Sequence, residues 1–264
     1  MDDIKLIGIF KERNFGLTGI MSVLILTLII GLLAFKTRND QWNVWKLNKD
    51  ITFYNNSPLL STADGPYFLG QAKYLNENKS ISMQLEKRFF PEYDQKKGNK
   101  KIYNEISMFD ISLLPISINY FSIFFDNDLL LTANKLIPIT ALITAILIAV
   151  FFIILGFGYE GVIAGLGASL SQSIYVRTSV GRVDTDLLNV GLFYLILGLI
   201  LASIKVEDKK NKLALICMAG FFNFLFAWWY QHPGFLIPFI FTLVLLQFFN
   251  RQKLSFSIIQ IILF

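Results

Sequence analysis

The sequence predicts an all-α membrane protein: a polytopic bundle of about six complete transmembrane helices and the start of a seventh, with a long ordered first external loop. Of the 264 residues, 54% are hydrophobic and 26 are phenylalanine. In a soluble domain about half of the residues are apolar even when glycine is counted among them, whereas the 54% of this chain leaves glycine out. The chain is therefore more apolar than a soluble domain. The apolar residues also gather in runs close to the ~20 residues that a helix needs to cross a bilayer. Both observations place the chain in a membrane.

The first transmembrane helix is expected at residues 15–35. This run is longer than the ~7 to 15 apolar residues of a signal-peptide core, and no small-residue cleavage site follows it. We therefore expect it to be retained. Lys5, Lys11 and Arg13 precede it, which favours a cytoplasmic N-terminus.

The segment 36–128 is too polar for lipid, with nearly balanced acidic and basic residues. It also contains apolar clusters such as Phe89-Phe90-Pro91 and the run 111–125. A disordered linker would not carry such clusters, so an ordered external loop is predicted.

Further spans are expected at five apolar runs: 129–157, 161–175, 187–204, 213–230 and 235–249. Counting crossings places 36–128, 176–186 and 231–234 outside. Of the short segments, those assigned to the outside carry only Arg177 and Arg182, although Lys36 and Arg38 lie just beyond the first span. Those assigned to the cytoplasm carry most of the basic residues: Lys5, Lys11, Arg13, Lys205, Lys209, Lys210, Lys212, Arg251 and Lys253.

Two of the apolar runs are short. The run 161–175 is rich in glycine, alanine and serine, with small residues at four-residue spacing, which predicts close packing against other helices. The run 254–264 covers roughly half of a ~30 Å hydrocarbon core. It either lies on the membrane surface or is the start of a seventh helix in a longer protein, and we favour the second interpretation.

The net charge of +5 does not indicate a nucleic-acid partner, because the basic residues fall in short clusters beside apolar runs, as topology signals do. The single cysteine, Cys217, excludes an intrachain disulfide.

The connector VRTSVGRVDTDLL at 176–188 places charged residues between two apolar runs. Asp184 and Asp186 are two positions apart, so in an extended segment their carboxylates project to the same side. Two carboxylates can bind a hard divalent cation such as Mg²⁺ or Mn²⁺. The alternative is that Asp184 caps the following helix and Asp186 complements its positive end. Charged groups at a lipid boundary are costly and usually functional, which favours the metal site.

The external loop contains a second candidate, Asp64, in the segment STADGPYFLGQAKYL at 61–75. Asp-Gly is a common turn, and the residues after it can begin a helix. Alone, this pattern does not separate a functional acid from a turn residue.

Three segments together resemble the catalytic subunit of oligosaccharyltransferases of the bacterial and archaeal single-subunit type. They are ADGPYFLGQAKYL in the first external loop, SIYVRTSVGRVDTDLLNV between the third and fourth spans, and FAWWYQHPG after the fifth. The most specific piece is Arg-Thr followed six residues later by Asp-Thr-Asp. The resemblance implies transfer of an oligosaccharide from a polyprenyl-pyrophosphate donor to an acceptor asparagine in Asn-x-Ser/Thr, at the external or periplasmic face of the plasma or inner membrane.

The resemblance also implies roles for individual residues. Asp64, Asp184 and Asp186 would hold Mg²⁺ or Mn²⁺, and Asp64 would also contact the acceptor amide. Arg177 would lie in or beside the same pocket and position the carboxylates.

Two substrate-binding residues are expected with less support from the family. Tyr230 lies where the family places a residue facing the donor glycan. Arg182 matches no family role, and its positive charge could attract the donor pyrophosphate or be simply solvated.

The family also has a glutamate on a later external loop and a C-terminal soluble domain with a Trp-Trp-Asp-Tyr-Gly signature, and neither is present in these residues. Trp228-Trp229-Tyr230 lacks the aspartate and glycine of that signature, and interfacial aromatics explain it. We therefore expect the 264 residues to be the N-terminal portion of an enzyme, with little turnover alone. The alternatives are another polyprenyl-phosphate-sugar glycosyltransferase, of protein O-mannosyl or lipid A type, and a non-enzymatic transporter subunit.

Overall fold

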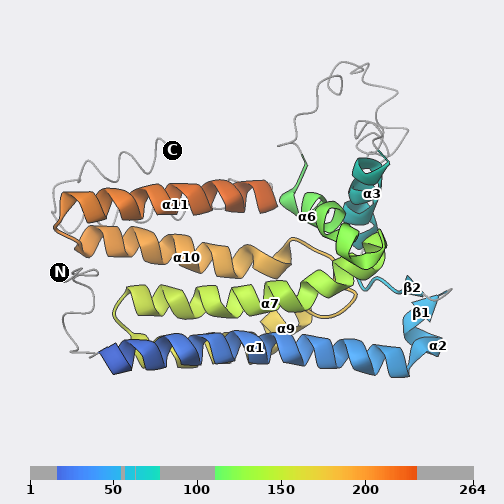
Figure 1. Ribbon diagram of the computed structural model, residues 1–264, viewed down its shortest axis with the longest axis horizontal. Helices are drawn as coiled ribbons and strands as arrows, with labels where there is room; N and C mark the ends of the chain where they lie inside the picture. The colour runs from blue at the N-terminus through green and yellow to red at the C-terminus, as the bar shows by residue number, and fades with distance from the viewer. Residues whose placement is uncertain (1–16, 55–56, 63, 78–110, 231–264) are drawn as a thin grey trace, which may run out of the picture. The chain divides into compact units, whose positions relative to one another are not determined.

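The computed structural model describes residues 17–54, 57–62, 64–77 and 111–230, which are mostly helical (Figure 1). Four of these helices are long and apolar enough to cross a membrane: α1 (Leu17–Leu47), α7 (Leu129–Ile154), α10 (Asp186–Lys205) and α11 (Lys209–Tyr230). This agrees with the predicted helical membrane protein. The total number of crossings stays a prediction.

Three predicted spans coincide with helices to within a few residues: 129–157 with α7, 187–204 with α10 and 213–230 with α11. α10 differs from its predicted run by one residue at each end, and α7 ends three residues before its run does. The predicted span 235–249 and the run 254–264 lie outside the described residues.

The first helix is longer than predicted. α1 continues for a further twelve residues beyond position 35, to Leu47. Its 31 residues would extend about 46 Å at ~1.5 Å per residue, more than a ~30 Å hydrocarbon core. The first part of the predicted external loop is therefore a polar extension of this helix.

The predicted span 161–175 is not one helix. α8 (Gly158–Leu170) ends at Ser171, which has a non-helical ψ of 136°, and α9 (Gln172–Arg177) begins at the next residue. Neither piece has the length of a crossing helix. The interruption places α9 and the connector after it in a different compact unit from α8.

The described residues form two compact units. One comprises those within 1–33, 142–171 and 188–264, and the other those within 34–141 and 172–187. We refer to them as the bundle unit and the loop unit.

In the bundle unit, α1 and α8 pack against the same helix, α7. A Cβ added to Gly31 of α1 would lie 2.8 Å from Ile146 of α7. On α8, a Cβ at Gly161 or Gly165 would lie 2.8 or 2.9 Å from backbone carbonyl oxygens of α7. Small residues therefore allow the close approach that the sequence predicted for 161–175.

The loop unit contains shorter elements between the end of α1 and the start of α7. After α1 come α2 (Lys49–Thr52) and an antiparallel hairpin of β1 (Phe53–Tyr54) with β2 (Ser57–Pro58). α3 (Gly65–Asn76) packs against α6 (Leu113–Ser122), and a short 3₁₀ turn, η3 (Ile123–Phe125), follows α6 (Figure 1). α9 and the connector 178–185 complete this unit, which holds five of the six predicted site positions, all except Tyr230.

Candidate functional site

The connector 178–185 joins α9 to α10 and carries Asp184. Its sharpest turn is at Gly181, where φ is +82°. A Cβ at this position would lie 2.5 Å from the Trp45 ring of α1 and 3.0 Å from the Leu59 carbonyl oxygen. Only glycine combines this backbone conformation with so little space. The connector therefore lies directly against the end of α1 and the segment that follows the hairpin.

Backbone groups of the connector are bound by neighbouring elements. Gln41 of α1 accepts a hydrogen bond from the Val180 N–H at 3.0 Å, and Asn134 of α7 accepts one from the Gly181 N–H at 2.8 Å. The Gly181 carbonyl oxygen accepts a hydrogen bond from the Ser61 N–H at 2.8 Å. Since Ser61 is three residues before Asp64, this last bond joins the two acidic segments that the sequence singled out.

Asp184 is half-buried just before α10. Burial raises the pKa of its carboxyl above the ordinary value of 3.8, and the negative charges of Asp186 and Asp64 raise it further. Hydrogen bonds from the backbone N–H groups of Thr185 and Asp186 act in the opposite direction and are outweighed. The three aspartates are thus close enough to interact electrostatically, although Asp64 is more than a hundred residues from the other two.

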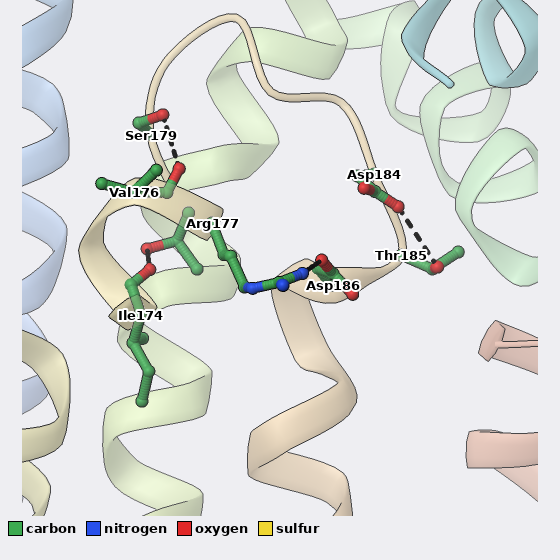
Figure 2. Close-up of polar contacts among 8 residues, drawn as sticks. Ile174, Val176, Arg177, Ser179, Asp184, Thr185 and Asp186 are labelled. Carbon is green, nitrogen blue, oxygen red and sulfur yellow. Dashed lines mark hydrogen bonds and ion pairs between the residues drawn. The ribbon is translucent and has the colours of Figure 1, made fainter. Parts of the chain in front are cut away.

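Asp186 is the first residue of α10, where a negative charge complements the positive end of the helix. Its carboxylate also accepts a hydrogen bond from Nη1 of Arg177, the last residue of α9. Figure 2 shows the Arg177 side chain extended toward Asp186, whereas Asp184 turns toward Thr185. The sequence offered a favourable interaction with the helix dipole as the alternative role of Asp186. In the structure, Asp186 has this position and also forms an ion pair with Arg177.

Asp64 occupies the position before α3, but its side chain makes no capping hydrogen bond. The carboxylate is exposed. An aspartate used only to cap the helix would accept a hydrogen bond from a first-turn N–H group. The side chain is therefore available for a ligand.

The two substrate-binding candidates lie in different units. Arg182 of the connector is part-buried, and its Nε atom is buried without a hydrogen-bond partner within the described part of the chain. Tyr230, the last residue of α11, belongs to the bundle unit, where its ring packs 5.7 Å from that of Phe226.

A divalent cation suits this site in chemistry. The donors are all carboxylate oxygens, which Mg²⁺ and Mn²⁺ prefer. Burial and, to a smaller degree, the charges of Asp186 and Asp64 raise the pKa of Asp184, and a cation would offset both effects. The arrangement is not a preformed metal centre: within 17–54, 57–62, 64–77 and 111–230, no three His, Cys, Asp or Glu side chains lie close enough to hold an ion. Binding would require these carboxylates to close together or other ligands to join them.

Several residues that support the site were not identified from the sequence. Arg38, Gln41 and Trp45 contact the connector from α1, and Asn134 contacts it from α7. The first three recur at helical spacing just beyond the apolar part of α1. This spacing alone could not identify them, because polar residues on one face of a helix ordinarily face water rather than a packed partner.

In the comparison with known families, residues 102–264 match the family described as Oligosaccharyl transferase STT3, N-terminal. The matched region includes the whole connector and α10. A search of curated proteins finds no match.

Proposed function

Since the chain belongs to the oligosaccharyl transferase STT3 family, we propose that it transfers an oligosaccharide from a polyprenyl-pyrophosphate donor to the side-chain amide of an acceptor asparagine. The observation that carries this proposal is the 2.8 Å hydrogen bond from the Ser61 N–H to the Gly181 carbonyl oxygen, which joins the segment of Asp64 to the connector of Asp184. It supports one acidic site built from two distant segments of the chain.

The acceptor nitrogen needs activation because its lone pair is delocalised into the amide carbonyl. Carboxylates that accept hydrogen bonds from the two amide N–H groups can twist the C–N bond out of conjugation and withdraw a proton as attack proceeds. In this proposal Asp64 provides one acceptor, since its carboxylate is exposed and free of capping. Arg177 holds Asp186 and thereby limits the movement of the acidic cluster.

The transfer forms a bond between the amide nitrogen and the anomeric carbon of the donor sugar. The bond between that carbon and the pyrophosphate oxygen breaks, and its electron pair leaves with the lipid pyrophosphate. The amide nitrogen loses one proton, first to a nearby carboxylate and then to solvent. Arg182, with its buried Nε, would interact with the departing phosphate charge.

Asp64, Asp184 and Asp186 would hold Mg²⁺ or Mn²⁺. When bound, such an ion supplies positive charge that neutralises the carboxylates and the leaving group. The remaining substrate-binding role, contact of Tyr230 with the donor glycan, belongs to the same proposal.

The membrane location fits a lipid-linked donor. Four helices of the described residues are long and apolar enough to cross a bilayer. We propose that the connector and α3 face the external or periplasmic side, where the acceptor protein would approach.

The test is transfer by the full-length protein, reconstituted with a lipid-linked oligosaccharide, an Asn-x-Thr peptide and Mn²⁺. Asp64→Asn and Asp184→Asn should each lower kcat/KM by at least ~100-fold, because each removes a charge from the reacting centre. The matched control is Asp50→Asn, which neutralises an exposed aspartate on α2. Transfer by the two site variants at the level of this control would overturn the proposal.

A further inference from the structure

Arg38 is an arginine whose side chain is fully buried, with 0% of its surface exposed. It lies on α1, in the polar extension beyond the apolar part of the helix. A charged side chain that leaves water loses hydration energy unless hydrogen bonds replace it. A leucine or methionine would fill the same volume at lower cost, so the guanidinium has another purpose than packing.

The guanidinium binds the segment that leads into the acidic connector. Nε and Nη2 donate hydrogen bonds to the Thr178 hydroxyl at 3.1 and 2.7 Å, and Nη1 donates to the Thr37 hydroxyl at 2.9 Å. The ring of Tyr175 on α9 lies 4.5 Å from the centre of the charge. These contacts fix the guanidinium plane against the end of α9.

Thr178 in turn is fixed by its neighbours. Its hydroxyl donates to the Ile174 carbonyl oxygen at 2.8 Å while it accepts from Arg38, so it has one orientation. Thr178 follows Arg177, which pairs with Asp186, and begins the connector to Asp184. A displacement of Thr178 therefore moves both the arginine and the aspartates of the site.

The same face of α1 contacts the connector at two further turns. Gln41 binds the Val180 N–H group, and Trp45 lies against Gly181. Positions 38, 41 and 45 recur at the spacing of one helical face. Arg38 is the charged member of this row and is the one that reaches α9.

We propose that Arg38 is a positioning residue for the acidic site: through Thr178 it holds Arg177 and the connector, so that Asp184 and Asp186 are presented together. This inference rests on the proposed function for its catalytic consequence. Its structural consequence, a connector ordered by Arg38 before any ligand binds, stands separately.

The experiment uses hydrogen–deuterium exchange on the full-length protein in EDTA, followed over peptides that contain residues 176–186. The variants Arg38→Gln and Thr178→Val should speed exchange of this segment by about 10-fold, the effect expected when a buried hydrogen bond is lost. The control on the same helix is Lys36→Gln, which changes an exposed lysine that pairs with Asp40 at the surface. Thr178→Ser keeps the hydroxyl and should exchange like the wild type.

A second readout is the Mn²⁺ concentration that gives half-maximal thermal stabilisation. It should rise by about 10-fold in Arg38→Gln and Thr178→Val and stay unchanged in Lys36→Gln and Thr178→Ser. If Arg38→Gln fails to fold, the comparison of Thr178→Val with Thr178→Ser tests the inference instead, because only the serine variant keeps the hydroxyl that Arg38 binds. The inference would be overturned if Thr178→Val and Thr178→Ser had the same exchange rate in residues 176–186 and needed the same Mn²⁺ concentration for half-maximal stabilisation.

The two proposals fail in different ways. If Asp184→Asn leaves peptide transfer intact, the proposed function is wrong, and the exchange data still judge Arg38. If Asp184→Asn abolishes transfer while the Arg38 and Thr178 variants match Lys36→Gln, the positioning role alone is wrong.

Discussion

Individual side chains in the loop unit divide into acidic groups that reach the surface and buried groups that bind the connector backbone. Asp64 is exposed and Asp184 is half-buried, whereas Asn134 is almost fully buried and bound to the connector backbone. This separation is what a site needs if its acids are to stay in place while charge develops.

Gly181 is the residue at which the connector is most constrained. Its φ of +82° and the 2.5 Å distance from an added Cβ to Trp45 both oppose a side chain. We expect Gly181→Ala to lower the free energy of unfolding by roughly 1–3 kcal/mol, from strain and displacement of the ring.

The control for this change is Gly167→Ala on α8, where an added Cβ meets nothing within 4 Å. It should be neutral or slightly stabilising, because alanine favours a helix more than glycine does. Thermal unfolding of both variants in detergent measures the difference, and equal midpoints would contradict the constraint at Gly181.

Asp184 should make stability depend on pH in metal-free protein. Its folded-state pKa is raised, so its contribution to stability is complete below the ordinary value of 3.8 and is lost as the pH rises through the raised value. Asp184→Asn removes this loss. In EDTA at pH 7 the variant should unfold at a higher temperature than the wild type.

The difference in unfolding temperature between Asp184→Asn and the wild type should shrink as the pH falls toward the ordinary pKa of an aspartate. The Asp184 carboxyl of the folded wild type then also becomes neutral. Thermal unfolding between pH 5 and about 7.5 follows this trend. A variant less stable than the wild type at pH 7 would show that folding favours the charged form of Asp184, which contradicts a raised pKa.

At the level of helices, hydropathy predicted the positions of α7, α10 and α11, because in each of them the membrane length and the apolar run coincide. It failed for α1, whose last twelve residues are mostly polar; three of them contact the connector. It also failed at Ser171, where the break between α8 and α9 leaves no signal in a run of small residues.

The contact of α8 with α7 depends on small residues. A Cβ at Gly165 would lie 2.9 Å from the Ala145 carbonyl oxygen, so Gly165→Val should force the two helices apart. We expect a loss of roughly 1–3 kcal/mol in the free energy of unfolding.

Gly220→Val is the matched control, since an added Cβ at this position of α11 meets no atom within 4 Å. Chemical denaturation of the purified variants compares the two substitutions. A Gly165→Val protein as stable as Gly220→Val would mean that α8 does not need this close approach.

For the whole molecule, the family and the helical class could be predicted from the sequence. The residues that hold the connector in place could not. The aspartates were found because short motifs carry them. The bonds of Arg38 to Thr178 and of Gln41 to Val180 join positions about 140 residues apart, and one sequence contains no trace of such pairings.

The proposed sidedness can be tested with single cysteines in a Cys217→Ser background. Tyr54→Cys lies on the exposed hairpin of the loop unit, and Glu207→Cys lies between α10 and α11. A membrane-impermeant maleimide should label the first in intact cells whose outer membrane has been made permeable. It should label the second only after the inner membrane is opened.

The reverse labelling pattern would place the acidic connector on the cytoplasmic side, away from secreted acceptor proteins. Lys36 offers a control position, because it lies on α1 between the apolar part and the hairpin. Lys36→Cys should label together with Tyr54→Cys.

Binding of Mn²⁺ to the full-length protein tests most directly whether three distant aspartates form one site. Electron paramagnetic resonance counts free Mn²⁺ in a titration, without donor or peptide. We predict one bound ion in the wild type and a dissociation constant at least ~10-fold weaker in each of Asp64→Asn, Asp184→Asn and Asp186→Asn, with no change in Asp50→Asn. An affinity unchanged by Asp64→Asn would contradict a shared site.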